Sequence, residues 1–268
     1  SKLHSFRGHY AYSVQDMRRS QMAGTGIEND RAMAARENAE TKLDETVTAG
    51  AKIGENSRPA MLAGQIIDFL PTFAGQPGVL LRQLWLANPD VAQAAVVDSA
   101  GEQVSALAVE LEERRLLGAP GESVHLADRA APAVIVALGV GVGCFADEAG
   151  YAASPASLLD PSADPGEPPA QYVENGWPWP PRLGAQSFLS HGVWGEPAQS
   201  EAYARLAGIV SRVDTRVNTL TGQRFHVARV RSFEMELDVC LAADEHLEPP
   251  VVGGVVAGTA FLTGTLLP

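Results

Sequence analysis

The stretch APAVIVALGVGVGCFA, residues 131–146, is the longest uncharged apolar run in the chain. Charged pairs border it, Asp128-Arg129 before it and Asp147-Glu148 after it. A membrane-spanning helix needs roughly 20 such residues, so the run is too short to cross a bilayer in that form. Its length and its glycine-rich end predict a buried strand, and the rest of the fold is predicted around this strand.

Further strands are predicted on both sides of this run. Short apolar segments occupy 79–81 and 94–97, and the turn residues 98–101 precede a strand over Val104–Glu112. Two long strands are predicted over 224–241 and 251–267, and a helix over 201–213.

The first quarter of the chain has a different character. Residues 27–47 are rich in good helix formers, with acidic residues at the start and Gly50 after the end, which predicts a helix. Shorter helices are predicted over 12–22 and 59–69. The predicted fold class is therefore α+β, with a helical N-terminal region (1–75) followed by a mixed, β-rich, β-roll-like body (76–268).

Eight prolines fall between residues 155 and 181 and predict a long loop within the body. Loops of this length are commonly lids, binding loops or disordered links. Trp177 and Trp179 in this loop could close over a ligand, although we expect them to pack the loop against the body.

Composition limits the classes of partner and compartment. The 268 residues include 20 Lys+Arg and 32 Asp+Glu, a formal charge of −12, and no basic stretch, so binding to nucleic acid is not expected. No membrane interaction is expected either, and residues 1–7 lack the apolar core of a secretory signal. Cys144 and Cys240 form neither a ligand pair nor a disulfide framework, which favours the reducing cytoplasm.

Glu110 and Glu112 are the candidate metal ligands. In an extended strand both carboxylates lie on one face, about 7 Å apart. Two such groups can share Mg²⁺ or Mn²⁺ and leave coordination positions for water and substrate. An exposed strand face, or the start of a helix, would explain the same residues without a metal.

Two other patterns do not predict a catalytic or binding site. Glu234, Glu236 and Asp238 alternate with apolar residues, as on the solvent-exposed face of a half-buried strand. Gly139, Gly141 and Gly143 do not have the spacing of a phosphate-binding turn.

Several ordered segments resemble the 2-keto-4-pentenoate hydratase and oxalocrotonate decarboxylase branch of the fumarylacetoacetase superfamily. They are AYSVQ (11–15), GAKIGENS (50–57), QPGVLL (76–81), VELE (109–112) and AGTAFLTGT (257–265). The resemblance covers about a tenth of the chain.

This resemblance implies a metal-dependent lyase, a hydratase or decarboxylase, acting on a small 2-oxo acid. Mg²⁺ or Mn²⁺ held by Glu110 and Glu112 would chelate the substrate and stabilise a dienolate. The implied third metal ligand is Glu148, with Asp147 as the alternative. Lys52 and Ser57 are the implied catalytic residues, and the implied substrate-binding residues are Thr263, Gly264 and Thr265. A homo-oligomer is expected.

A second resemblance supports a different class of function. Residues 12–50 are also similar to the long helix of some tailed-phage major capsid proteins. This implies an assembly subunit without catalysis, and a binding protein of another kind is a third possibility.

Overall fold

The computed structural model describes residues 60–62, 65–68, 73–112, 121, 123–124, 130–161, 164–218, 222–243 and 248–267. Strands make up 52% and helices 12% of this part of the chain, so the predicted α+β class is wrong and the protein is strand-rich. The helices predicted over 12–22 and 27–47 lie outside the described residues. Within 59–69, the predicted helix is replaced by an antiparallel pair of strands, β1 (Ala60–Leu62) and β2 (Gln65–Asp68), and Ile66 and Ile67 are β-branched residues that favour strands.

The remaining strands form one mixed sheet in the order β6-β3-β4-β5-β12-β7-β11-β10-β9-β8, with the additional pairings β3–β7 and β12–β9. These strands are β3 (Val79–Leu86), β4 (Ala92–Val97), β5 (Gln103–Leu111), β6 (Ser123–Val124), β7 (Ala131–Phe145), β8 (Ser187–Ser190), β9 (Tyr203–Val217), β10 (Arg224–Ser232), β11 (Met235–Ala242) and β12 (Val255–Leu266).

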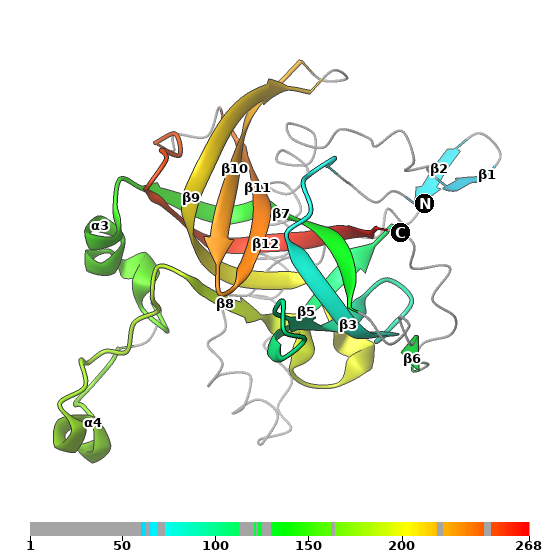
Figure 1. Ribbon diagram of the computed structural model, residues 1–268. Coiled ribbons are helices and arrows are strands. Elements are labelled where there is room, and N and C mark those ends of the chain that lie inside the picture. Colours follow the sequence, from blue (N-terminus) through cyan, green and yellow to red (C-terminus); the bar gives the residue numbers. More distant parts are fainter. Residues whose placement is uncertain are drawn as a thin grey trace.

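The two additional pairings close the sheet into two five-stranded rings that share β7 and β12 (Figure 1). One ring is β3-β4-β5-β12-β7 and the other is β9-β10-β11-β7-β12. Each ring has a three-stranded antiparallel meander, and the last strand of each meander runs parallel to one of the shared strands. The rings therefore have the same connectivity, with the roles of β7 and β12 exchanged.

The shared position of β7 explains its sequence. Residues 133–138 are all buried, and they alternate between two hydrophobic clusters. Ala133, Ile135 and Ala137 join one cluster, while Val134, Val136 and Leu138 join the other. A strand that is buried on both faces is a continuous apolar run, as predicted for 131–146.

The other strand predictions have mixed outcomes. The strand at 104–112 and the turn at 98–101 are confirmed by β5 and by Gly101 with φ 86°. The helix predicted over 201–213 is wrong, because this segment belongs to β9, which pairs with β8, β10 and β12. The strand predicted over 224–241 is two strands, divided by a turn at Phe233 and Glu234.

The proline-rich stretch leaves the sheet as a projecting arm. It starts after helix α3 (Glu148–Ala153) and the short turn η2 (Pro155–Ser157), and it carries the helix α4 (Ala170–Asn175). Figure 1 shows α4 at lower left, held well away from both rings. Two further short turns, η3 (His191–Val193) and η4 (Pro197–Gln199), connect β8 to β9.

Candidate functional site

The candidate metal ligands Glu110 and Glu112 lie where β5 runs parallel to β12. Glu110 is the register partner of Thr263, and the Glu112 backbone N–H donates to the Gly264 carbonyl at 3.0 Å. Both glutamates are half-buried, with the fully buried Leu111 between them. The structure thus brings the two glutamates next to Thr263 and Gly264, and Thr265 follows directly on β12.

Glu148 lies at the opposite end of the same strands. Phe145, three residues before Glu148, pairs with Val255, whereas Glu110 pairs with Thr263. Thr263 is eight residue steps along β12 from Val255, which corresponds to roughly 26 Å. Asp147 is also at this far end, where its Oδ1 accepts a hydrogen bond from the Gly150 N–H at 2.7 Å and caps α3. Neither carboxylate can complete a site with Glu110 and Glu112.

The remaining residues of the implied lyase site cannot be placed. Lys52 and Ser57 lie outside the described residues. Among the residues that are described, no group of three His, Cys, Asp or Glu side chains is arranged to hold a metal ion.

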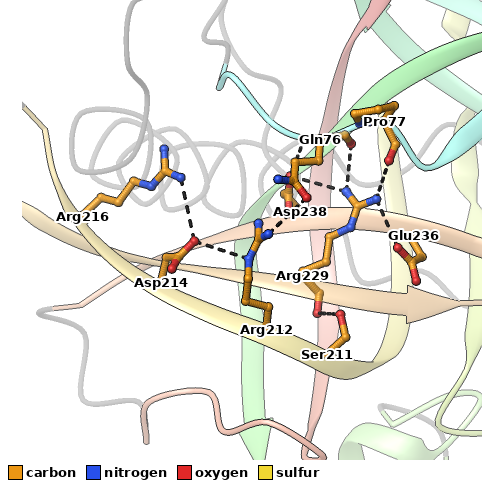
Figure 2. A network of polar contacts seen from close by, with 9 residues as sticks. All are labelled: Gln76, Pro77, Ser211, Arg212, Asp214, Arg216, Arg229, Glu236 and Asp238. Atoms are coloured by element: carbon orange, nitrogen blue, oxygen red, sulfur yellow. Dashed lines mark hydrogen bonds and ion pairs between the residues drawn. The ribbon is translucent and has the colours of Figure 1, made fainter.

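A buried ion pair holds the entry to β3 against the second ring (Figure 2). Arg229 on β10 donates to the Gln76 and Pro77 carbonyls at 2.8 and 2.7 Å, and it lies 3.5 Å from Asp238 on β11. Asp238 Oδ2 also accepts from the Gln76 N–H at 2.8 Å. These contacts fix residues 76–77, so the pair has a structural role.

This ion pair corrects an expectation from the sequence. Asp238 was expected on a solvent-exposed face with Glu234 and Glu236, but its side chain is only 1% exposed. Glu234 and Glu236 are exposed as expected, although Glu234 lies in the turn before β11 and not in the strand. The alternation with apolar residues did not reveal that Arg229 and the 76–77 segment cover Asp238.

A small cavity lies between the paired strands β7 and β12 and the base of the arm. It has a volume of about 230 Å³ and is lined by Gly141, Gly258, Thr259, Leu159 and Arg205, among others. This is below the roughly 300–1,000 Å³ of typical small-molecule sites. The Arg205 guanidinium donates to the carbonyls of Leu159, at 2.8 Å, and of Ala156 and Leu158. Its donors are thus used to fix the arm.

The base of the arm is a rigid stem in which the two ends of the loop pair with each other. Leu158 and Arg182 form an antiparallel bridge, and the Leu159 N–H donates to the Pro181 carbonyl at 2.9 Å. The Arg182 side chain donates to the carbonyls of Ala152 and Ser154 at 2.8 and 2.9 Å. Two arginines therefore anchor the stem, one from β9 and one from the loop itself.

Beyond the stem, aromatic side chains order the tip of the arm. Tyr172 makes edge contacts with Trp177 and Trp179, at centroid distances of 5.5 and 4.9 Å. The Trp179 indole N–H donates to the Gly166 carbonyl at 3.1 Å. Trp177 and Trp179 therefore pack around Tyr172 within the arm, and not against the body as expected.

The tip leaves large apolar surface uncovered. The Val173 side chain, on α4, is 65% exposed and Trp177 is 56% exposed. Exposed apolar residues are ordinary when scattered singly, but neighbouring ones on a projecting element are typical of a contact surface. Sequence analysis singled out Trp177, yet only the structure shows that it contacts Tyr172 within the arm and stays 56% exposed.

The two cysteines are free thiols with little reactivity. Burial, with a smaller contribution from Glu248, raises the pKa of Cys144 to about 11, and burial also raises that of Cys240. Over the described part of the chain, no helix combines the length and apolar character needed to cross a membrane. Comparison of the chain with protein-family models, with curated proteins and with solved structures gave no match.

Proposed function

We propose that the chain is an assembly subunit that binds neighbouring copies of itself through its arm. The observation that carries this proposal is the exposure of Val173 and Trp177 on a tip that is internally ordered and rigidly anchored. A surface that is already ordered loses little conformational entropy when it binds. Tryptophan is also the residue type most often found at energetic centres of protein interfaces.

The size of the arm fits this role. The described residues 164–180 give 17 residues for contact, near the lower end of the roughly 20–30 that each partner contributes to a standard interface. The free thiols Cys144 and Cys240 are compatible with the reducing cytoplasm, which we propose as its location.

Sedimentation velocity over a range of protein concentrations tests the proposal. We expect the wild-type chain to form larger species as its concentration rises, and Trp177→Ala to weaken this association at least tenfold, because loss of an anchoring tryptophan typically costs about 2 kcal/mol or more. Trp194→Ala is the matched control, because Trp194 is 55% exposed but lies on the body. A wild-type chain that stays monomeric throughout the range would refute the proposal.

The metal-dependent lyase is a second candidate, supported by one observation. Glu110 and Glu112 lie side by side with Thr263 and Gly264 at the β5–β12 junction, as the resemblance to the hydratase family implies. If the junction binds a metal, calorimetric titration with Mg²⁺ or Mn²⁺ will give one saturable site that is lost in a folded Glu110→Ala, Glu112→Ala variant. Absence of binding by the wild type would remove this candidate.

A further inference from the structure

We infer that the surface that receives the arm is the positively charged outer end of the β9–β10 hairpin on a second copy of the chain. This inference rests on the proposed function, since it names the partner surface of the same arm. It follows from the distribution of charge, from the exposed arginine side chains on the hairpin and from the geometry of the two elements.

The arm is acidic throughout. Residues 161–180 contain Asp164, Glu167 and Glu174, and no Lys, Arg or His. Glu167 and Glu174 are exposed and lie on the same tip as Val173 and Trp177. In a chain with a formal charge of −12, most surfaces would repel such a tip.

Positive charge in the described residues is concentrated on β9 and β10. These two strands carry six of the eight described arginines, Arg205, Arg212, Arg216, Arg224, Arg229 and Arg231, and lysine is absent from this part of the chain. Arg205 and Arg229 are used internally, and Arg212, the register partner of Arg229, donates to the Gln76 side chain at 3.1 Å. Arg216 and Arg224 lie at the outer end of the hairpin, where Asp214 is the one carboxylate among the described residues. Asp214 lies 3.5 Å from Arg212 and 3.8 Å from Arg216, and both arginine side chains stay more than 40% exposed.

The arginines at the outer end are suited to an acidic, aromatic partner. The Arg216 guanidinium already lies over the Phe73 ring, 5.0 Å from its centroid, which shows that this surface accepts aromatic faces. Arg224 is exposed and has no polar partner among the described residues, and its register partner Val217 is 55% exposed. Arg224 and Val217 thus place a cation next to an apolar side chain. This pair is complementary to the carboxylate of Glu174 and the indole of Trp177 on the arm.

Geometry requires the contact to be between two copies. The outer end of the hairpin lies at the top of Figure 1 and α4 at lower left, on the far side of the body, so an arm on its anchored stem does not reach its own hairpin. An interface between two different surfaces of the same chain is heterologous, and repeated contacts of this kind build rings or open filaments.

Charge-reversal variants test this inference. The arm variant is Glu167→Lys, Glu174→Lys, and the hairpin variant is Arg216→Glu, Arg224→Glu. Each variant alone should stay monomeric in sedimentation velocity at concentrations where the wild type associates, because its two contact surfaces now repel. An equimolar mixture should associate again, because each variant then meets the charge complementary to its own. The control variant is Arg82→Glu, which reverses a charge on β3, in the ring that does not contain the hairpin. It should associate like the wild type.

The outcomes separate this inference from the proposed function. If Trp177→Ala abolishes association but the hairpin variant, folded by circular dichroism, associates like the wild type, the arm is the contact element and the hairpin is not its receptor. If the wild type never associates, both proposals fail. If the two variants remain monomeric when mixed, charge pairing between arm and hairpin is refuted.

Discussion

The buried ion pair between Asp238 and Arg229 is the sharpest energetic feature at the scale of single residues. Their side chains are 1% and 6% exposed, and within the described part of the chain Oδ1 of Asp238 has no hydrogen-bond partner. We expect Arg229→Met to reduce the free energy of unfolding by about 3–5 kcal/mol, because it leaves a carboxylate buried without its cation. Urea denaturation measures this loss.

The double variant Arg229→Met, Asp238→Asn is the matched control. The asparagine amide is neutral, and its oxygen can still accept the hydrogen bond from the Gln76 N–H. It should recover part of the stability lost by the single change, because no charge remains unpaired, while the hydrogen bonds from Arg229 to the Gln76 and Pro77 carbonyls are missing in both variants. If the double variant is as unstable as the single variant, the ion pair does not account for the cost.

At the scale of elements, the critical feature is the close antiparallel pairing of β7 and β12 around Gly141 and Gly258. Gly258 has φ 148°, and a Cβ atom there would lie 2.1 Å from the Gly141 carbonyl oxygen. Gly258→Ala should therefore destabilise the protein by at least about 2 kcal/mol, through backbone strain and the clash with β7.

Gly141→Ala is a control on the same pair of strands, because a Cβ atom at Gly141 would meet none of the described residues within 4 Å. This change should alter the free energy of unfolding by less than about 0.5 kcal/mol. Equal effects of the two substitutions on the thermal midpoint would contradict the role assigned to Gly258.

Periodicity in the sequence predicts elements whose pattern follows from local burial. The strand at 131–146 was predictable because both its faces are buried, and the turn before β5 because Asp98 and Gly101 are residues that form turns. The break between β10 and β11 was missed because Phe233 and Glu234 adopt positive φ, which is uncommon for these residue types. For β9, pairing with three strands outweighs a composition that suits a helix.

The candidate site was predictable only in part, because a local sequence pattern does not show which distant segments pair with each other. The proximity of Glu110 and Glu112 follows from strand geometry, and the structure adds Thr263 through long-range pairing. The distance to Glu148 depends on which ends of β7 and β12 meet, and the direction of the arm depends on Arg205, far away in the sequence. Neither relation is visible in a local pattern.

At the scale of the whole molecule, the arm and the outer end of the β9–β10 hairpin are surfaces of opposite charge that lie far apart on the two-ring body (Figure 1). The arm carries negative charge and exposed apolar side chains, and the outer end of β9–β10 carries arginines. This polarity suits head-to-tail assembly, because each copy has one surface of each kind.

Association should also weaken as salt is raised from about 0.05 to 0.5 M, since screening acts on exposed charges.

The most direct test of assembly through the arm is hydrogen–deuterium exchange measured at low and high protein concentration. We predict that the backbone amides of residues 170–179 exchange more slowly at high concentration, while those of the exposed turn at 98–101 do not change. Exchange of residues 170–179 that stays the same across concentrations at which the protein associates would show that the arm is not the contact element.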